Sequence, residues 1–464
     1  MVYTEGGEAR TAASPEQEPK RVTERRANAE SLQRRFNDQS AAIGIAGLGY
    51  VGLPLALTFT EKGFRVLGFD IDGSKVESLN AGRNYIQHID GNRLSTAVAE
   101  KRFEATTDFG RLNEPDALII CVPTPLTAQR EPDMSYVVNT VQLIRARLRP
   151  GQLVVLESTT YPGTTDELVR GILEESGLKC GSDFYLAFSP EREDPGNGKY
   201  NTATIPKIVG GVDETGGDLA QSLYDKVVVS TVRVASAREA EAAKLVENIF
   251  RAVNIALVNE LKIVFDRMGI DIWNVLDAAS TKPFGFMRFN PGPGWGGHCI
   301  PLDPFYLSWK AREYGVTPKF IELAGEVNVQ MPEYVITKLS LALNDRRKAM
   351  RGSRILVLGI AYKKDIDDPR ESPAFEIIES LLHLGAEVTY HDPHVPKAPR
   401  MRSWPDLPPM KSSPLTEEVL RSQDAVVIVT DHSAVDYEAV VRHAGLVVDT
   451  RGVYRAPRPN VVKA

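Results

Sequence analysis

A single cysteine follows a glycine-rich stretch in the second half of the chain. Cys299 lies within residues 292–304, which read GPGWGGHCIPLDP. Glycine backbone costs stability and is typically retained where main chain approaches a ligand closely. A thiol beside amide donors and a helix start has a lowered pKa, and its thiolate attacks aldehydes. The alternative is that Cys299 is a small buried hydrophobic residue; Cys121 and Cys180 are predicted to be structural.

Lys244 and Asn248 lie four residues apart on a predicted long helix over 235–268, with Glu241 nearby. The stretch has no Pro or Gly, and its apolar residues recur at three- and four-residue steps. Lys244 and Asn248 therefore share one helix face. If that face looks into a site, Lys244 can stabilise an oxyanion or pass a proton and Asn248 can supply a second donor. Otherwise the pair lies on a solvated surface. A helix of this length also offers a face for a second chain, so we expect at least a homodimer.

A short apolar run at 43–46 leads into a glycine motif, GLGYVG at 47–52, and Asp70 ends the next predicted strand. In a dinucleotide fingerprint the glycines make a tight turn, admit the pyrophosphate and let helix meet strand, while the acid binds the ribose hydroxyls. The alternative is a glycine turn that serves packing. An acid at this strand end repels a 2′-phosphate, so the pattern predicts NAD rather than NADP. The residues expected to bind the cofactor here are Gly47, Gly49, Tyr50, Val51, Gly52 and Asp70.

Three polar clusters follow predicted strands, at 157–163, 189–195 and 363–372. The first two lie where ligand-facing loops of a doubly wound domain are found. The third follows the first strand of a second α/β region and has no glycine fingerprint. Its basic residues suit an acidic ligand such as a diphosphate better than a second NAD. Surface charge alone is the alternative.

Strands alternate with helices on both sides of the long helix, which predicts an α/β fold. Strands are predicted at 43–46, 65–69, 117–122, 153–156, 184–188 and 207–209, and again at 355–360, 387–390, 425–429 and 446–448. We expect two Rossmann-like, doubly wound parallel-sheet domains joined by a helical centre. The expected parts are a mobile charged arm at 1–38 that is helical from about 22 to 36, an NAD-binding domain at 39–234, a central helical domain with the Cys299 loop at 235–349, and a second α/β domain at 350–464.

Composition and charge exclude several classes of protein. The 464 residues are 42% hydrophobic and 25% charged, as in a globular protein of two or three domains. A net charge of −6 lacks the basic excess that binds phosphate backbones, so no nucleic-acid partner is expected. Apolar runs are strand-length, so no membrane span is expected. Three cysteines fit a reducing compartment, and the cytoplasm is the predicted location. No metal site is predicted.

In combination the motifs resemble those of the nucleotide-sugar dehydrogenases, the family of the UDP-glucose and GDP-mannose dehydrogenases. The resemblance runs from about residue 43 to residue 454 and rests on the stretches 47–56, 122–126, 157–165, 189–197, 240–261, 291–304, 361–372 and 447–454. SPEREDPGN at 189–197 with GGHCIPLDPFYL at 296–307 most resembles the bacterial UDP-N-acetylglucosamine 6-dehydrogenases. The resemblance implies that residues 350–464 bind the UDP-sugar and that the protein serves surface polysaccharide synthesis.

The resemblance implies a four-electron oxidation of a C6 alcohol to a carboxylate, with NAD used twice and no aldehyde released. Cys299 would trap the aldehyde as a thiohemiacetal, and the second hydride transfer would leave a thioester for water to open. Lys244 and Asn248 would support the developing oxyanion. Asp303 and Thr159 would orient the water, with Glu191 as an acid/base candidate.

Further binding roles are carried over by motif. Thr124 and Arg370 would line the cofactor. The residues expected to bind the UDP-sugar are Lys363, Arg451, Arg192 and Gly296.

Two departures from the glucose-acting branch lie where the sugar is expected to bind. Leu302 stands where that branch has a basic residue, and Arg192, Glu193 and Asp194 follow Glu191 in place of apolar residues and a second acid. We therefore assign no second catalytic glutamate. The differences favour a UDP-N-acetylhexosamine, with UDP-N-acetylglucosamine as the best candidate and UDP-N-acetylmannosamine or UDP-glucose as alternatives.

The residues also allow two other functions. One is a single-step NAD hydroxyacid dehydrogenase with a structural Cys299, which would form one NADH per substrate. The other is a non-catalytic NAD- or nucleotide-sugar sensor whose charged arm recruits a partner, although no motif looks degraded.

Overall fold

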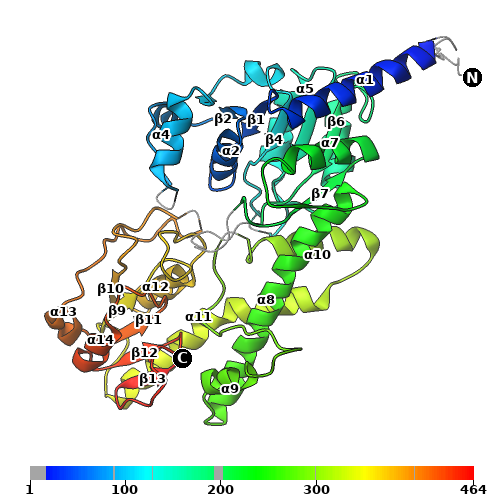
Figure 1. Ribbon diagram of the computed structural model, residues 1–464. Coiled ribbons are helices and arrows are strands. Elements are labelled where there is room, and N and C mark those ends of the chain that lie inside the picture. Colours follow the sequence, from blue (N-terminus) through cyan, green and yellow to red (C-terminus); the bar gives the residue numbers. More distant parts are fainter. Residues whose placement is uncertain (1–16, 87–88, 128, 193–201, 298, 402) are drawn as a thin grey trace, which may run out of the picture. The chain divides into compact units, whose positions relative to one another are not determined.

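The computed structural model describes residues 17–86, 89–127, 129–192, 202–297, 299–401 and 403–464 (Figure 1). The first part of the predicted arm, the 189–197 motif from Glu193 onward and His298 lie outside these residues. The chain divides into two compact units, and the division between Ala242 and Ala243 falls inside helix α8 (Ala237–Arg267). The short segment Pro125–Asp133 groups with the second unit. No helix within the described ranges is long and apolar enough to span a membrane.

The first unit is built on a sheet whose described strands follow the order β3-β2-β1-β4-β5-β6-β7-β8. Strands β1 to β6 pair in parallel, β7 runs antiparallel to β6, and β8 is parallel to β7. The central strands are buried along their whole length, which explains their unbroken apolar sequence. The strands are β1 (Ala42–Ala46), β2 (Arg65–Phe69), β3 (Phe103–Thr106), β4 (Ala117–Ile120), β5 (Leu153–Leu156), β6 (Tyr185–Phe188), β7 (Lys207–Gly211) and β8 (Thr231–Arg233).

Helices cover this sheet, and several begin at an aspartate that caps the first amides. Asp72, Asp90 and Asp213 accept backbone N–H groups at the starts of α3, α4 and α7. The helices are α1 (Gln17–Asn37), α2 (Gly52–Glu61), α3 (Gly73–Asn80), α4 (Gly91–Ala99), α5 (Ser135–Arg145), α6 (Arg170–Glu174) and α7 (Glu214–Tyr224), with the short turns η1 (Phe109–Asn113) and η2 (Thr164–Val169).

The described end of the predicted arm is packed against the first unit. Leu32 and Phe36 are buried in the same apolar core as β1 and α2. Arg35 forms an ion pair with Asp116, with 2.7 Å between the guanidinium nitrogen and the carboxylate oxygen. The expectation of a mobile arm through residue 38 is therefore wrong for this end, because two large apolar side chains suffice to anchor a helix that is otherwise polar.

The second unit carries a parallel sheet in the order β10-β9-β11-β12-β13. Its strands are β9 (Arg354–Leu358), β10 (Glu387–His391), β11 (Ala425–Ile428), β12 (Val447–Asp449) and β13 (Val461–Lys463). Its helices, besides most of α8, are α9 (Ile272–Ala279), α10 (Asp303–Ala311), α11 (Lys319–Asp345), α12 (Pro373–His383), α13 (Glu417–Ser422) and α14 (Tyr437–His443), with the turn η3 (Arg312–Tyr314).

The predicted fold class is confirmed, and each predicted strand is present to within two residues. The long helix predicted over 235–268 is α8. The three strands that the sequence did not predict, β3, β8 and β13, all lie at sheet edges. Edge strands are partly exposed and carry polar residues, so they lack the apolar runs by which the central strands were found.

Candidate active site

The Cys299 loop is shaped by close packing within the second unit. The carbonyl of Cys299 accepts the N–H groups of Leu302 and Asp303, at 3.1 and 2.8 Å, in the turn that starts α10. A Cβ at Gly296 would lie 2.9 Å from Cβ of Tyr362, and one at Gly297 would lie 2.8 Å from its ring. Gly297 also has a φ of 87°. The packing of Tyr362 therefore explains these glycines, whether or not Gly296 also meets a ligand.

Four of the predicted catalytic residues are brought together at this loop. Lys244 and Asn248 project from α8, and both are buried with Asp303. Asn248 Nδ2 donates a hydrogen bond of 2.6 Å to Oδ2 of Asp303. Lys244 and Asp303 both act electrostatically on the Cys299 thiol. The face of α8 that carries Lys244 and Asn248 is therefore not a solvated surface; it lies beside the cysteine.

Burial controls the ionisation of this cluster. Burial and the neighbouring Asp303 raise the pKa of Cys299 to about 11, against the opposing pull of the cations Lys244, Arg370 and Arg251. The predicted lowering of the thiol pKa is therefore wrong for this state of the protein, because desolvation outweighs the nearby cations. Burial also raises the pKa of Asp303 to about 6, although Lys244 and the hydrogen bond from Asn248 favour its charged form.

The glycine motif of the first unit has the geometry that a dinucleotide requires. Gly47 has a φ of 93°, and a Cβ at Gly52 would lie 1.8 Å from the carbonyl oxygen of Gly47, so helix α2 can approach β1 this closely only at a glycine. A Cβ at Gly49 would meet nothing within 4 Å. That open space at the start of α2 is where a pyrophosphate fits. Tyr50 and Val51 are half-buried beside it, and Val51 immediately precedes α2.

Asp70 follows β2 at the predicted position and is buried. Its Oδ2 accepts the N–H of Leu48 within the glycine motif, and its Oδ1 accepts the N–H of Asp72, both at 3.0 Å. The carboxylate is thus fixed against the turn whose cofactor it is predicted to contact. The residues of the motif fit a bound NAD.

The remaining candidates of the first unit follow consecutive strands of its sheet. Thr124 follows β4 and is buried, Thr159 follows β5 and is half-buried, and Glu191 and Arg192 follow β6. Because β4, β5 and β6 are parallel neighbours, their carboxyl ends share one sheet edge with the glycine motif after β1. Arg192 donates from Nη1 to the carbonyl of Pro206 at 2.7 Å.

The sequence did not predict that Glu241 holds a loop of the first unit by hydrogen bonds. Its carboxylate accepts the N–H of Gly163 at 2.7 Å, and both the N–H and the hydroxyl of Thr165 at 2.9 and 2.6 Å. Burial raises its pKa to about 7, against these hydrogen bonds. Glu241 therefore fastens the loop that carries Thr159 to the start of α8. A carboxylate on a helix face gave no sign of partners more than 70 residues away.

Three of the four candidates for the UDP-sugar, together with Arg370, lie in loops of the second unit. Arg370 forms a bidentate pair with the buried Asp368, at 2.9 and 2.6 Å, and its carbonyl accepts the N–H of Gly297 at 3.3 Å. Lys363 is half-buried in the loop after β9. Arg451 follows β12 and donates from Nε to the carbonyl of Val429 at 2.7 Å. A Cβ at Gly292 would lie 2.6 Å from Arg451 Nη1, so the start of the cysteine loop lies against this guanidinium.

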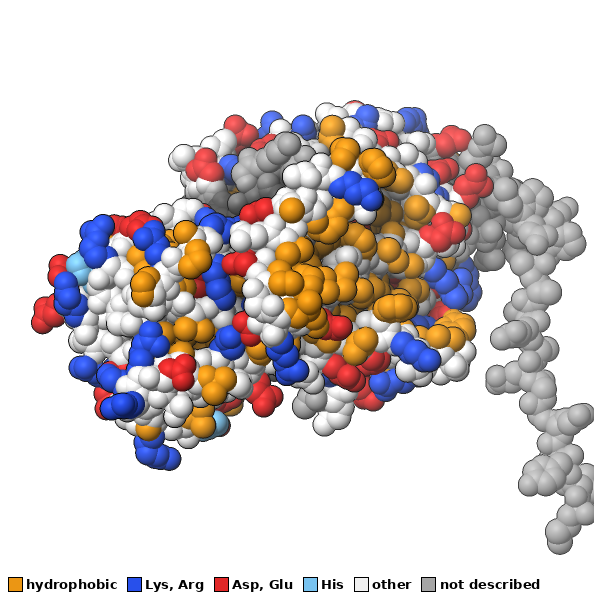
Figure 2. Space-filling view, turned by 90° about the horizontal axis from the view of Figure 1, so that it is seen from below, with side chains coloured by type: hydrophobic (Ala, Val, Ile, Leu, Met, Phe, Trp, Pro, Cys, Tyr) orange, Lys and Arg blue, Asp and Glu red, His pale blue; other side chains and the backbone are white. Residues whose placement is uncertain are grey.

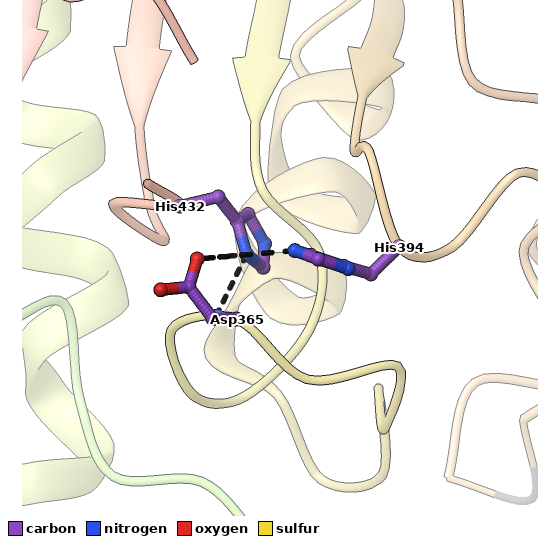
Figure 3. A group of neighbouring side chains, drawn as sticks. All are labelled: Asp365, His394 and His432. Atoms are coloured by element: carbon purple, nitrogen blue, oxygen red, sulfur yellow. Dashed lines mark hydrogen bonds and ion pairs between the residues drawn. The ribbon is translucent and has the colours of Figure 1, made fainter. Parts of the chain in front are cut away.

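Asp365, His394 and His432 form a group that could hold a metal ion, at the carboxyl ends of β9, β10 and β11 (Figure 3). Both ring nitrogens of His432 are already engaged. Nδ1 accepts the N–H of Asp365 at 3.0 Å, so Nε2 carries the proton that points to Oδ2 of Asp392 at 3.1 Å. His432 therefore fastens the loop that carries Lys363 and offers no lone pair to an ion in this arrangement.

Comparison with known proteins assigns the family. Models of the UDP-glucose/GDP-mannose dehydrogenase family match its NAD binding domain at residues 41–228, its central domain at 238–330 and its UDP binding domain at 356–456. The UDP-N-acetyl-D-glucosamine 6-dehydrogenase of Pseudomonas aeruginosa is 38% identical over 364 residues, which cover 78% of this chain and 85% of the relative.

A further relative and a solved structure come from Pyrococcus horikoshii. The UDP-N-acetyl-D-mannosamine dehydrogenase of Pyrococcus horikoshii is 35% identical over 424 residues, covering 89% of this chain and 96% of the relative. A solved structure of the UDP-D-ManNAc dehydrogenase from that organism superposes with a TM-score of 0.81 at 33% identity, covering 91% of this chain and 98% of the other. The predicted family and NAD cofactor are confirmed. The chain belongs to the UDP-glucose/GDP-mannose dehydrogenase family and is an NAD-dependent oxidoreductase.

Proposed function

We propose that this protein oxidises the C6 alcohol of a UDP-N-acetylhexosamine to the carboxylate, with Cys299 as the covalent nucleophile. The observation that carries the proposal is the cluster of the half-buried Cys299 with the buried residues Lys244, Asn248 and Asp303. A structural cysteine needs only apolar neighbours. A half-buried thiol next to a lysine and a carboxylate that is itself held by an amide is arranged for chemistry.

The residues of the cluster have separable tasks in this proposal. NAD, when bound, accepts a hydride in each of the two oxidation steps. Cys299 Sγ attacks the aldehyde carbon of the sugar. Because the resting thiol is protonated at neutral pH, its proton passes to the former carbonyl oxygen, which becomes the hydroxyl of the thiohemiacetal. Lys244 is the neighbouring cation that stabilises the oxyanion. Asn248 binds Asp303 through one N–H and has a second to offer the substrate.

The last step is hydrolysis of the thioester. Asp303 is ionised above its raised pKa of about 6, so it can accept a proton from an attacking water near neutral pH. We assign Thr159 to orient that water with Asp303, and Glu191 as a second acid/base group. Both follow parallel strands of the first sheet, where ligand-facing residues of such folds lie.

The division of labour along the chain is part of the proposal. We assign 39–234 to NAD binding, 235–349 to the cysteine chemistry and to dimer formation, and 350–464 to the UDP-sugar; the three family models support these limits. Arg451 is half-buried, and desolvation lowers its pKa, so its charged form gains from contact with an anion such as a diphosphate. Lys363, Arg192 and Gly296 complete the proposed sugar contacts, and Thr124 and Arg370 those to NAD.

We further propose a homodimer through α8. Val246, Phe250, Leu257 and Val264 recur at steps of four and seven residues, so they form one stripe, and between 43% and 61% of each is exposed. Phe284 and Met287, which follow α9, are 71% and 65% exposed. Figure 2 shows hydrophobic side chains gathered over a broad area of one face of the molecule. Apolar surface on this scale favours a second copy of the chain as its cover.

The most specific part of the proposal is the identity of the sugar. We propose UDP-N-acetylglucosamine, because the relative from Pseudomonas aeruginosa acts on that sugar by its name. UDP-N-acetylmannosamine is the second candidate, on the relative from Pyrococcus horikoshii. The three cysteines are free, as expected in a reducing compartment such as the cytoplasm.

The test is NADH formation by the purified protein with equal amounts of UDP-N-acetylglucosamine, UDP-N-acetylmannosamine, UDP-N-acetylgalactosamine, UDP-glucose and GDP-mannose, with the product mass recorded. We expect about two NADH per sugar, an acid as the product and the highest kcat/KM with UDP-N-acetylglucosamine. One NADH per substrate would favour a single-step dehydrogenase. Binding of NAD and sugar without turnover would favour a sensor.

A further inference from the structure

A lysine that belongs to no motif lies at the catalytic edge of the first sheet. Lys207 is the first residue of β7, the strand that runs antiparallel to β6. That reversal places the start of β7 at the edge where β5 and β6 end. The Lys207 side chain is 4% exposed, and those of Glu157 and Glu191 are 0% and 12% exposed. An ammonium group is thus buried between two carboxylates that follow the neighbouring strands.

The contacts of Lys207 match its three donors. Nζ lies 3.1 Å from Oε2 of Glu157, 3.3 Å from the carbonyl oxygen of Pro190 and 3.4 Å from Oε2 of Glu191. Two of the three contacts are to the segment after β6, at Glu191 and the residue before it. The third is to the end of β5, which immediately precedes the loop with Thr159. Lys207 therefore links Glu191, a catalytic candidate, to Glu157 at the end of β5.

Tyr224, a neutral side chain, also contacts Glu157 and Lys207. The hydroxyl of Tyr224 on α7 donates to Oε1 of Glu157, and Lys207 Nζ lies 5.1 Å from the centre of the Tyr224 ring. Burial raises the pKa of Tyr224 and that of Cys121, another titratable side chain that acts on Lys207 and Glu157, so both stay protonated. Burial alone lowers the pKa of Lys207, but the charges of Glu157 and Glu191 outweigh it and the pKa ends above its ordinary value. The lysine stays charged and lies between two carboxyl groups. Burial raises the pKa of Glu157, although the charge of Lys207 and the hydrogen bonds from Tyr224 and Lys207 favour its charged form.

We propose that Lys207 is a positioning residue for Glu191, which it holds in place and in the ionised form by sharing its ammonium group between Glu191 and the buried anchor Glu157. Lys207 does not touch substrate in this role; it acts through Glu191. The inference rests on the proposed function, since Glu191 has acid/base work to do only if the sugar is oxidised at this edge of the sheet.

The first test is the pH dependence of NADH formation by the full-length protein, with NAD and its preferred UDP-sugar. Lys207→Met removes the charge and keeps the chain length. We expect kcat to fall about 10- to 100-fold with KM nearly unchanged. The acid limb contains two ionisations, that of Glu191 and that of Asp303 with its pKa of about 6. The Glu191 ionisation should move up by about one pH unit, because Glu191 loses its cation. Lys207→Arg should restore the acid limb. In a Glu191→Gln background Lys207→Met should change neither the limb nor kcat further.

A matched control separates positioning from general stability. Lys338→Met breaks a lysine–carboxylate pair that is only partly buried, that with Asp266 at 2.9 Å, in the second unit. We expect a lower melting temperature without movement of the acid limb. If Lys207→Met also leaves the limb in place, or lowers kcat equally in the Glu191→Gln background, Lys207 is a structural residue and the inference is overturned.

A second variant decides the question if Lys207→Met does not fold. Glu157→Gln keeps the shape of the anchor, removes its negative charge and leaves the whole lysine charge to Glu191. The acid limb should then move to lower pH, and an unmoved limb would overturn the inference. If the unaltered protein forms no NADH with any UDP-sugar, the proposed function itself fails. Turnover by the unaltered protein with none of these shifts would contradict the inference alone.

Discussion

Asn248 donates a hydrogen bond of 2.6 Å to the carboxylate of Asp303, and this bond joins the long helix α8 to the first turn of α10. The two residues are 55 positions apart, and both are buried. Between them in the chain lies the loop with Cys299. The bond therefore sets the position of the cysteine relative to Lys244, which lies one helical turn before Asn248.

Asp303 should make the protein less stable at neutral pH than a neutral isostere would. Its pKa is about 6 in the folded protein and ~3.9 in the unfolded chain, so between these values the folded state holds a proton that the unfolded state has lost. The raised pKa lowers the free energy of unfolding. This loss is absent below the pKa of the unfolded chain and complete above the pKa of the folded protein. Asp303→Asn should therefore unfold at a higher temperature than the unaltered protein above pH 6, by an advantage on the order of 2 kcal/mol, while turnover is lost.

Thermal unfolding as a function of pH measures this advantage. It should shrink as the pH falls from about 6 towards ~4. The exposed Asp345→Asn provides the control and should show no such trend. An advantage that stays constant with pH would show that Asp303 does not titrate in this window.

Two glycines of the NAD motif should respond differently to the same substitution. Gly52→Ala places a Cβ 1.8 Å from a backbone oxygen, which cannot move away, so the melting temperature should fall by several degrees. Gly49→Ala meets nothing within 4 Å in the free protein, so stability should be nearly unchanged while the Kd for NAD rises at least ~10-fold, because the methyl group occupies pyrophosphate space. Calorimetry with and without NAD distinguishes the two effects. Equal NAD affinity of Gly49→Ala and the unaltered protein would place the pyrophosphate elsewhere.

Much of this site could be predicted from local patterns. The spacing from Gly47 to Asp70 assigns Asp70 to the cofactor that the glycine turn would bind, and the structure shows its carboxylate held against that turn by the Leu48 amide. The step from Lys244 to Asn248 correctly puts both on one helix face. The spacing of apolar residues and the positions of turn glycines carry such information, because the residues concerned belong to one supersecondary unit.

Other parts of the site depend on contacts between distant segments. Lys207 pairs with Glu157, 50 residues earlier, and Glu241 holds Gly163 across 78 residues, so neither partner can be read from its neighbours. The glycines before Cys299 suggest an approaching ligand, but the atoms nearest to Gly296 and Gly297 are those of Tyr362. The prediction of a lowered pKa for Cys299 was wrong for a related reason. A sequence suggests which cations are near the thiol, but it does not show how strongly the thiol is desolvated.

A charge in the apolar stripe of α8 should separate the proposed dimer. Phe250 is 48% exposed and lies in the middle of that stripe. Phe250→Asp should shift the mass measured by light scattering from that of a dimer to that of one chain, because an unpaired carboxylate cannot be buried at the contact. Leu143→Asp on α5, where 43% of the side chain is exposed, is the control and should leave the mass unchanged. If the Phe250→Asp protein were still a dimer, the dimer contact would lie on another face and the proposed role of α8 would be wrong.

The central claim is that Cys299 carries the second oxidation, and the most direct measurement is the NADH yield and product mass of Cys299→Ser with the preferred UDP-sugar. The account predicts that Cys299→Ser forms no acid at a measurable rate, a loss of at least ~1000-fold, because a serine hydroxyl is a far weaker nucleophile for the aldehyde. Cys180→Ser, which alters a free cysteine of the first unit, should still give about two NADH per sugar. A Cys299→Ser protein that yielded the acid with two NADH per sugar would contradict the account.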